Sequence, residues 1–416
     1  MKVLVVGKGG REHAIITALH ESPTETEIYT FPGSDAIFTL AKPVEADGVA
    51  SLIAKMKELK IDLCVAGEES YLVKDEGLAN ACAVAGIPCW GPPKEASQLE
   101  ASKEFAKEFM VRQSIPTGGY SSVETVEEAL EAIGGQYPTV LKFDGLAAGK
   151  GVAVCLNEQD AKAFLDEVLG QRKFGGGRLL VEEYLEGPEI SIFASVVDGD
   201  YQILAPARDY KRIYDADEGP NTGGMGAVSS LEMFQGDLRK VIDETIVKPT
   251  VEGLQKEGLP YRGFLYFGLM LTPNGPKVIE YNCRFGDPEA EAVLPMVVGD
   301  FAAHVFEGAK GILNPNLIAF KSGWSVCLVS ASAGYPAGSH SGDVISGLEK
   351  VSDARVFHAG TRLNDSGQFE TAGGRVLVIS ADGGTREEAV ANVYRESNKV
   401  SFDGMQRRTD IGTRNF

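Results

Sequence analysis

Short apolar runs alternate with helix-like segments over the first ninety residues. Runs such as "KVLVVG" and "IDLCVAG" are typical of buried strands, and "VASLIAKMKELK" before the second of these repeats its apolar positions at helical spacing. This alternation predicts a doubly wound parallel sheet. We therefore expect an N-terminal Rossmann-like domain over residues 1–100 of an α/β and α+β multidomain chain.

The hydrophobic pattern changes after residue 100. The stretch "ASQLEASKEFAKEFMVRQ" predicts one helix, because Leu99, Phe105 and Phe109 recur at near-helical spacing. Residues 123–187 then give helix, hairpin, helix and strand, which predicts a small flap subdomain. From residue 188 the strands alternate as in an antiparallel sheet, so that 101–122 and 188–320 are expected to form a larger subdomain. Residues 321–416 predict a smaller α+β domain.

Composition narrows the class of protein. The chain has 416 residues, a net charge of −19 and no apolar run of membrane-spanning length, so neither nucleic acid nor a membrane is an expected partner. The start of the chain predicts a strand broken by glycines and not a signal peptide. The six cysteines contain no C-x-x-C pair, which predicts neither a zinc site nor a disulfide framework and favours the reducing cytoplasm.

A glycine-rich stretch, "LKFDGLAAGKGVAV", has the composition of a phosphate-binding loop. The spacing from Gly145 to Gly149 is one residue too short for a P-loop, and Gly151 follows Lys150 where a hydroxyl is needed. The stretch also lies between two strand-like runs instead of before a helix. These features predict a mobile flap over a phosphate at a hairpin tip.

A second glycine turn, "VGKGGREH", follows the first strand. Glu12 stands where the dinucleotide fingerprint needs a small residue, and the second strand ends in "FPG" without an acid for ribose. A nicotinamide site is therefore disfavoured. Arg11 favours a small anion at the helix N-terminus, while a tight turn without a ligand remains open.

Two further strands carry acidic side chains. In "KVIEYNCRFGDPEAE", Glu280 and Asn282 are two residues apart, so both side chains leave one face, where a carboxylate and an amide oxygen suit magnesium. A solvated strand face is the alternative, and Arg284, Asp287 and Glu289 in the following loop favour a site. The strand "LLVEEYLEGPEIS" either contacts a nucleoside or ends in a solvated acidic tip.

Taken together, these runs resemble the ATP-grasp superfamily, and within it the phosphoribosylamine–glycine ligase (glycinamide ribonucleotide synthetase) family. The matching runs occur in family order along the whole chain: "GKGGREHA", "KFDGLAAGKGV", "GPNTGGMGA", "GFLYFGLM", "VIEYNCRFGDPE", "GDVISGL", "VFHAGT", "GGRVL" and "DIGTR". The ordered set is much more specific than any single run.

The resemblance implies a role for each matching residue. ATP phosphates would contact Lys103 and Lys142, beneath a flap formed by Gly145, Gly149, Lys150 and Gly151. The backbone of Glu182 and Leu185 would contact adenine, Glu189 the ribose, and Glu280 and Asn282 the Mg²⁺ or Mn²⁺. Asp209, Lys211, Arg284 and Asp287 would act with Lys142 as catalytic residues on the acceptor side. The substrates would further contact Gly9, Gly10, Arg11, Gly33, Asn221, Gly223 and Gly224.

Three positions depart from the family pattern. Tyr210 stands where the family usually has His in "D-H-K-R", the run "G-P-E-A-P-L" is replaced by "GEESYL" at residues 67–72, and a "P-G-N" turn ends in Ser34. The last two departures lie in the N-terminal domain. They affect the expected contacts with the amine substrate and not those with ATP.

The resemblance implies a cytoplasmic ligase of purine synthesis. It would join glycine to 5-phosphoribosylamine at the expense of ATP, through a glycyl phosphate, as a monomer or weak homodimer. Another ATP-grasp carboxylate–amine ligase with a different acceptor is the near alternative. A nucleotide-binding regulatory protein without turnover and a nicotinamide-dependent oxidoreductase are the more distant ones.

Overall fold

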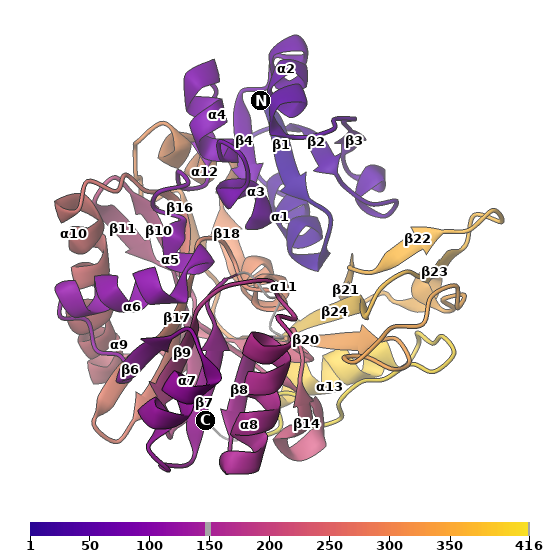
Figure 1. Ribbon diagram of the computed structural model, residues 1–416. Helices are drawn as coiled ribbons and strands as arrows, with labels where there is room; N and C mark the ends of the chain where they lie inside the picture. Colours follow the sequence, from indigo (N-terminus) through magenta and orange to yellow (C-terminus); the bar gives the residue numbers. More distant parts are fainter. Residues whose placement is uncertain (146–150, 415–416) are drawn as a thin grey trace.

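The computed structural model describes residues 1–145 and 151–414 of the chain. Figure 1 shows the N-terminal parallel sheet at the top, a small four-stranded unit at the bottom and the C-terminal strands at the right, around a large central sheet. Within the described ranges, no helix combines the length and apolar character needed to cross a membrane.

The N-terminal unit is a five-stranded parallel sheet in the order β3-β2-β1-β4-β5, which confirms the predicted doubly wound sheet. Its strands are β1 (Lys2–Gly7), β2 (Glu27–Pro32), β3 (Lys42–Pro43), β4 (Leu63–Ala66) and β5 (Cys89–Trp90). Its helices are α1 (Gly10–His20), α2 (Val49–Leu59), α3 (Ser70–Val73) and α4 (Leu78–Ala85). The central strands β1 and β4 are apolar and buried, as expected for parallel strands that are covered on both faces, whereas the edge strand β3 is exposed.

The segment predicted as one helix forms two, α5 (Gln98–Ala101) and α6 (Lys103–Arg112). Ser102 between them is extended and caps α6, since its hydroxyl accepts a hydrogen bond from the Phe105 amide at 3.1 Å. The carboxylate of Asp144 accepts a second bond, 2.6 Å from the Lys103 amide. The apolar period continues across the break, and for this reason hydrophobicity alone did not reveal it.

The four-stranded unit, hereafter the flap unit, is antiparallel with the order β6-β9-β7-β8. It contains β6 (Tyr120–Val123), α7 (Val126–Ile133), β7 (Thr139–Phe143), β8 (Val152–Cys155), α8 (Glu158–Leu165) and β9 (Leu179–Glu183). It has its own apolar core, which includes Leu141, Leu165 and Leu179. The glycine-rich stretch joins β7 to β8, as the hairpin pattern predicts.

The central sheet runs in the order β17-β16-β10-β12-β15-β20-β24-β21, with β11 beside β10. Its strands are β10 (Glu189–Val197), β11 (Asp200–Ile203), β12 (Ala207–Asp209), β15 (Gly226–Ser229), β16 (Arg262–Thr272), β17 (Gly275–Asn282), β20 (Trp324–Ala331), β21 (Arg355–His358) and β24 (Arg375–Gly383). One continuous sheet thus joins the strands of the predicted larger subdomain, β10, β11, β12, β15, β16 and β17, to the C-terminal strands β20, β21 and β24.

Helices and short hairpins surround this sheet. The helices are α9 (Gly236–Ile242), α10 (Lys248–Lys256), α11 (Glu289–Val293), α12 (Phe301–Ala309) and α13 (Arg386–Ser397). Two short hairpins pair β13 (Arg212–Tyr214) with β14 (Glu218–Asn221) and β22 (Thr361–Leu363) with β23 (Phe369–Thr371). On either side of α12, β18 (Val297–Gly299) and β19 (Ile318–Phe320) form a further antiparallel pair. The loop expected around residues 219–227 thus contributes a strand, β14, at its start.

Candidate active site

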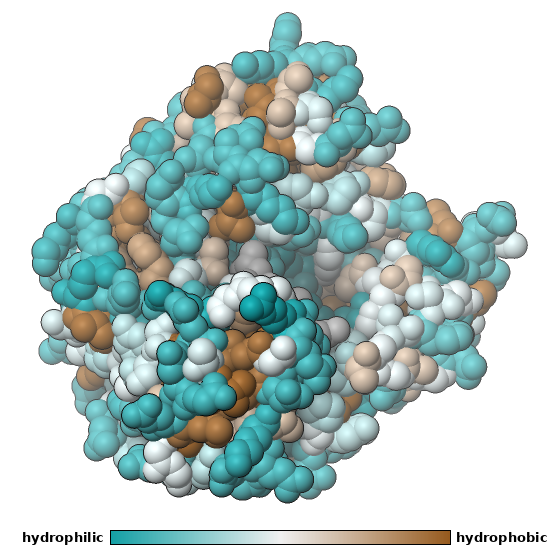
Figure 2. All heavy atoms as spheres, in the orientation of Figure 1, coloured by the Kyte–Doolittle hydropathy of each residue, from teal (hydrophilic) through white to brown (hydrophobic). Residues whose placement is uncertain are grey.

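The face shown in Figure 2 is hollowed between the N-terminal sheet, the flap unit and the C-terminal strands. A cavity there is lined by side chains from α5, α6, β7, β8, β9 and β17, which the chain brings together from distant segments. Among the residues predicted for ATP and metal, Lys103, Lys142, Gly145, Gly151, Glu182, Glu280 and Asn282 line this one cavity. Gly149 and Lys150 lie outside the described residues.

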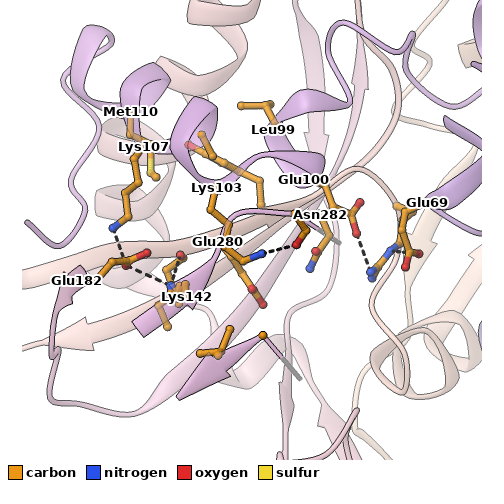
Figure 3. A pocket seen from close by; sticks show the side chains of 17 residues that line it. Glu69, Leu99, Glu100, Lys103, Lys107, Met110, Lys142, Glu182, Glu280 and Asn282 are labelled. Carbon is orange, nitrogen blue, oxygen red and sulfur yellow. Dashed lines mark hydrogen bonds and ion pairs between the residues drawn. The ribbon is translucent and has the colours of Figure 1, made fainter. Parts of the chain in front are cut away.

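Three lysines meet in the cavity, two from α6 and one from β7. Lys107 lies one turn after Lys103 on α6, and its ammonium is 2.8 Å from the Glu182 carboxylate, which Lys142 also contacts at 3.2 Å (Figure 3). Lys103 donates to the Gly145 carbonyl at 2.9 Å, and Lys142 also donates to the Ile279 carbonyl at 3.2 Å. Burial lowers the pKa of Lys103, while nearby Glu280 opposes the shift. This group of cations suits an anionic ligand.

Glu280 and Asn282 lie on one face of β17, as their spacing predicts. A bulge helps to direct them, because Glu280 pairs with Gly268 and Val278 with Leu269, which leaves Ile279 as the extra residue. Gly268 makes room for Glu280, since a Cβ at that glycine would lie 3.1 Å from its Cγ. The surroundings orient the Asn282 amide nitrogen toward the Tyr281 carbonyl and Glu100 Oε1, each at 3.1 Å. That orientation leaves the amide oxygen for another partner.

Arg284 joins β17 to the N-terminal unit. Its guanidinium lies 2.7 Å from Glu100 on α5 and 3.1 Å from Glu69, in the loop after β4. Burial opposes the charged form of both carboxyls. For Glu69 the two guanidiniums of Arg284 and Arg11 prevail and lower its pKa to about 2, whereas burial raises the pKa of Glu100 to about 7. Arg284 is therefore held in place by an ion pair with Glu69.

A second polar group lies beside Glu280. Lys211 contacts Glu189 at 2.6 Å and Asp209 at 3.2 Å, so three residues predicted for ribose and acceptor are linked. The attraction of Lys211 lowers the pKa of Glu189, whereas burial raises that of Asp209. Behind them Glu289 contacts Ser191 at 3.1 Å, and burial raises its pKa to about 7. The group combines one cation with three carboxyls.

The N-terminal glycine turn is filled by the protein's own side chains. Glu12 accepts a hydrogen bond from the Gly9 amide at 2.7 Å and contacts Arg11 at 2.6 Å. A Cβ at Gly7 would lie 2.4 Å from the Glu12 side chain, so the glycine provides the space for that carboxylate. Glu12 thus occupies the position in which a dinucleotide phosphate would lie. This geometry argues against the nicotinamide alternative.

Arg11 makes more contacts within the protein than we expected for a residue that binds a free anion. Besides Glu12, it contacts Glu69 at 3.5 Å and the Phe285 carbonyl at 3.3 Å, and it is buried. Its carboxylate neighbours favour the charged form and outweigh the effect of burial, so its pKa is raised.

Gly9 and Gly10 face the loop that follows β17. A Cβ at Gly9 would lie 3.6 Å from Asp287, and one at Gly10 would lie 2.4 Å from Glu291. Asp287 in turn contacts Arg375 of β24 at 2.9 Å. Segments almost 370 residues apart therefore meet at one point.

Arg375 also reaches the predicted loop at Gly223 and Gly224. It donates to the Gly223 carbonyl at 2.6 Å and to the Asp287 carbonyl at 2.7 Å. A Cβ at Gly224 would clash with Pro288 at 2.4 Å. The structure thus brings Gly9, Gly10, Asp287, Gly223 and Gly224 together.

Two expected residues, Asn221 and Leu185, make none of the contacts described above, and a third, Gly33, lies beside the N-terminal glycine turn. Asn221 is exposed at the end of β14, and Leu185 is half-buried two residues beyond β9. Gly33 donates to the Gly7 carbonyl at 3.2 Å and has a φ of +69°, a conformation that favours glycine. The roles predicted for all three stay predictions.

Family models match the chain in order over most of its length. They describe the N domain (residues 1–100), the ATP-grasp (A) domain (residues 101–290) and the C domain (residues 325–414) of phosphoribosylglycinamide synthetase. The chain belongs to the phosphoribosylamine–glycine ligase family. The resemblance inferred from the ordered motifs is therefore confirmed.

Similar proteins agree with this membership. Phosphoribosylamine–glycine ligase of Caldanaerobacter subterraneus subsp. tengcongensis is 43% identical over 418 residues, 99% of each chain. The crystal structure of phosphoribosylamine–glycine ligase from Thermotoga maritima is 35% identical and superposes with a TM-score of 0.87 over 99% of this chain and 100% of that one.

A more distant structure shares the fold alone. The biotin carboxylase domain of Hydrogenobacter thermophilus 2-oxoglutarate carboxylase, in complex with MgADP and bicarbonate, is 20% identical with a TM-score of 0.72, over 98% of this chain and 91% of that one.

The structure shows where the departures from the phosphoribosylamine–glycine ligase pattern lie. Tyr210 is buried and faces away from Asp209 and Lys211, because its hydroxyl accepts from the Gly412 amide at 3.1 Å and Arg408 lies over its ring. In "GEESYL" the glutamate Glu69 keeps its contact with Arg284. The Tyr210 departure therefore lies outside the cavity.

Sequence reasoning missed four residues of this phosphoribosylamine–glycine ligase site: Glu69, Glu100, Lys107 and Arg375. Lys107 had a usable signal, since it lies four residues after Lys103 and therefore on the same helix face. Arg375 lies in "GGRVL", a run that carried the resemblance without a role. Glu69 and Glu100 had no signal of their own, because their importance comes from Arg284.

Proposed function

We propose that this chain ligates glycine to 5-phosphoribosylamine with ATP, giving glycinamide ribonucleotide, ADP and phosphate in purine biosynthesis. The observation that carries the proposal is the joint lining of one cavity by Lys103, Lys142, Glu280 and Asn282 in a chain of the phosphoribosylamine–glycine ligase family. The named relatives support the choice of substrates.

On the nucleotide side, Lys103 and Lys142 hold the phosphates, and the flap from Gly145 to Gly151, with Gly149 and Lys150, covers them. The backbone of Glu182 and Leu185 contacts adenine, and Glu189 the ribose. In support, Lys103 and Lys142 donate to neutral carbonyl oxygens, partners that a phosphate oxygen outcompetes because charge-assisted hydrogen bonds are stronger.

The donor set fits Mg²⁺ or Mn²⁺. Glu280 supplies a carboxylate and Asn282 an amide oxygen, which are hard ligands, and the orientation of the Asn282 amide favours its oxygen as the free atom. The bound cation would neutralise phosphate charge. Strand β17 would therefore supply two oxygen ligands to the cation, one from Glu280 and one from Asn282.

The reaction requires two displacements. A glycine carboxylate oxygen attacks the γ-phosphorus and ADP leaves, and the amine of phosphoribosylamine then attacks the carbonyl carbon of glycyl phosphate, releasing phosphate. Positioning and charge neutralisation are the main requirements of phosphoryl transfer. Lys142 stabilises charge on the transferred group, and Asp209, Lys211, Arg284 and Asp287 orient the acceptor side. The flap excludes water from the acyl phosphate.

Phosphoribosylamine, the second substrate, binds near the N-terminal glycine turn in this proposal. Gly9, Gly10, Arg11, Gly33, Asn221, Gly223 and Gly224 form its surroundings in this proposal. The proximity of Gly9 to Asp287 and of Gly223 to Arg375 supports a shared pocket for the ribose phosphate.

We further propose a cytoplasmic monomer or weak homodimer that acts on small molecules, without nucleic acid or membrane partners.

ADP release tests the proposal directly. We expect turnover only when ATP, glycine and freshly prepared phosphoribosylamine are all present, and loss of turnover when either substrate is omitted. Equal turnover with another amino acid in place of glycine would instead favour the alternative, an ATP-grasp carboxylate–amine ligase that accepts a different acid. Product mass should correspond to glycinamide ribonucleotide.

A further inference from the structure

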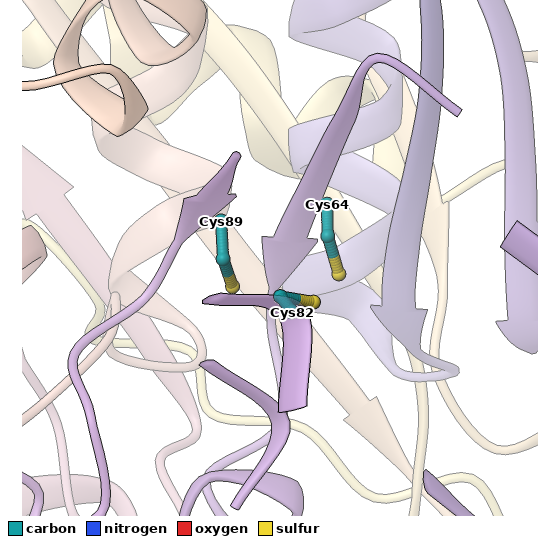
Figure 4. A group of neighbouring side chains, drawn as sticks. All are labelled: Cys64, Cys82 and Cys89. Carbon is teal, nitrogen blue, oxygen red and sulfur yellow. The ribbon is translucent and has the colours of Figure 1, made fainter. Parts of the chain in front are cut away.

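Three cysteines gather in the N-terminal unit, far apart in the sequence. The sulfur atoms of Cys64 on β4, Cys82 on α4 and Cys89 on β5 all lie within 4.8 Å of one another (Figure 4). None of the three is in a disulfide. Their spacing along the chain gave no sign of this group, which we name the cysteine cluster.

The fold explains why the three sulfurs meet. Cys64 and Cys89 are directly paired on the adjacent parallel strands β4 and β5, so their side chains leave the same face of the sheet. Helix α4 covers that face and contacts both strands, and Cys82 points from it toward the sheet. The positions are therefore fixed by sheet register and helix packing, which hold the sulfurs together without a bond between them.

The surroundings of the cysteine cluster are apolar on one side and open on the other. Cys64 and Cys82 are fully buried in the core with Leu72, Leu78 and Ile87. Cys89 is only half-buried and lines a groove of ≈ 650 Å³ between α4, β5 and α10. Cys89 is therefore the most exposed member of the cysteine cluster, and it lies beside this groove.

We propose that the cysteine cluster binds one soft monovalent metal ion of the Cu⁺ type. Thiolate sulfur selects soft cations such as Cu⁺ and Zn²⁺. Structural zinc almost always takes four protein ligands, whereas the group of candidate ligands here consists of three sulfurs. The apolar core disfavours excess charge, and a monovalent ion held by a mixture of thiolate and thiol sulfurs keeps the net charge small. Each thiol that binds as a thiolate releases its proton to solvent.

This site is separate from the proposed ligase chemistry, so the two can be tested independently. The protein, fully reduced and free of oxygen, is titrated with Cu⁺ in competition with bicinchoninate. The wild-type chain should remove about one Cu⁺ per molecule from the chelator, and X-ray absorption at the copper edge should show three sulfur neighbours.

Variants identify the ligands. Loss of a side chain that only supports a ligand typically weakens metal binding by about 10- to 100-fold. Cys82 is proposed as a direct ligand, so Cys82→Ser should weaken Cu⁺ binding by at least about a hundredfold. Cys89→Ser, at a half-buried position less critical for folding, should do the same. Cys155→Ser is the matched control, because Cys155 is a single buried cysteine in the flap unit, and it should bind as wild type does. ADP release should stay normal in Cys89→Ser.

Three results would overturn the proposal. Equal Cu⁺ affinity in wild type and in a Cys64, Cys82, Cys89 triple serine variant would exclude the cysteine cluster as the site. A fourth ligand in the absorption spectrum would contradict three-coordinate binding. Fewer than six free thiols in the freshly purified, denatured wild type, together with all three remaining thiols free in the triple serine variant, would show that the cluster forms a disulfide instead.

Discussion

Two glycine-rich turns in this protein were both expected to face phosphate, and their cations are paired differently. Beside the flap, Lys103 donates to a carbonyl and Lys142 to a carbonyl and one shared carboxylate. At the N-terminal turn, Arg11 contacts two carboxylates and a carbonyl. An anion that approaches the lysines replaces mainly neutral partners, whereas an anion at Arg11 must compete with Glu12 and Glu69. The difference supports the proposed phosphate contacts of Lys103 and Lys142, and it predicts that Arg11 contributes to stability in addition to its proposed place in the substrate pocket.

The largest effect should come from the phosphate side. Lys142→Ala and Glu280→Ala should each lower kcat by on the order of 10²- to 10³-fold, the usual cost of losing one group that stabilises charge in a transition state. Steady-state ADP release measures this effect. Lys162→Ala is the matched control, because Lys162 is exposed and pairs with Glu158 on its own helix. Near-normal rates in both site variants would contradict the phosphate and metal assignments.

The second prediction concerns the N-terminal turn. Glu12→Gln removes the nearer of the two carboxylates that pair with buried Arg11 and weakens the cap at Gly9, so the free energy of unfolding should fall by about 2 kcal/mol. Urea unfolding measures the change. Glu158→Gln, at an exposed ion pair, should change it by less than about 0.5 kcal/mol.

The same variant can reverse the comparison between the two turns. If Glu12→Gln left stability unchanged and instead raised KM for phosphoribosylamine strongly, the ion pair would serve the proposed substrate pocket alone and would not stabilise the fold.

Much of the fold and part of the site could be predicted, for identifiable physical reasons. The alternating pattern gave the parallel sheet, and the two-residue period placed Glu280 and Asn282 on one face. Period alone could not locate the bulge at Ile279 or the break at Ser102, since both depend on contacts with distant segments, Gly268 and Asp144. The cysteine cluster likewise depends on the register of β4 and β5.

Charge pairing was the least predictable feature. Arg11 looked like an anion ligand in the sequence, because nothing there shows that Glu69 and the Phe285 carbonyl lie beside it. Arg284 was expected on the acceptor side, and its partners Glu69 and Glu100 come from two other segments. Local rules describe the turn or strand that carries a cation, whereas tertiary packing decides whether that cation is already paired.

A smaller effect should distinguish a positioning lysine from those that hold phosphate. Lys107 is buried and contacts Glu182, whose backbone is proposed to contact adenine. Lys107→Met removes the ion pair with Glu182, worth about 1.5 kcal/mol, together with hydrogen bonds to the Thr117 hydroxyl and the Gly118 carbonyl, so KM for ATP should rise by about tenfold or more. The kcat should stay within about threefold of wild type, because phosphoryl transfer does not involve this side chain directly. Lys55→Met, at an exposed ion pair with Glu58, is the control. A loss of kcat like that of Lys142→Ala would place Lys107 among the phosphate ligands.

The smallest predicted effect is the pH dependence of Glu289, behind the acceptor side. Burial raises the pKa of its carboxyl to about 7, above its usual range near 4.5. The folded state therefore retains a proton that the unfolded state releases, and the stability contribution of Glu289 falls as pH rises from about 4.5 to about 7. Glu289→Gln cannot titrate. The stability of wild type relative to this variant should therefore decrease by on the order of 1 kcal/mol or more as pH rises from about 5 to 7, and it should level off above about pH 8.

The comparison with Glu289→Gln is needed because other groups titrate in the opposite sense. Burial lowers the pKa of His13, His304 and His358 to about 4, so their contribution to stability rises with pH up to their unfolded value near 6.5. These contributions are common to both proteins and cancel in the difference. Urea unfolding of both proteins across this pH range measures that difference. Parallel stability curves would show that Glu289 is already ionised in the folded state, and the three carboxyls around Lys211 would then all be charged. If the stability of wild type relative to Glu289→Gln instead falls as pH rises, Glu289 retains its proton in the folded state. One neutral carboxyl among the three would reduce the repulsion between the acceptor side and the proposed phosphate site.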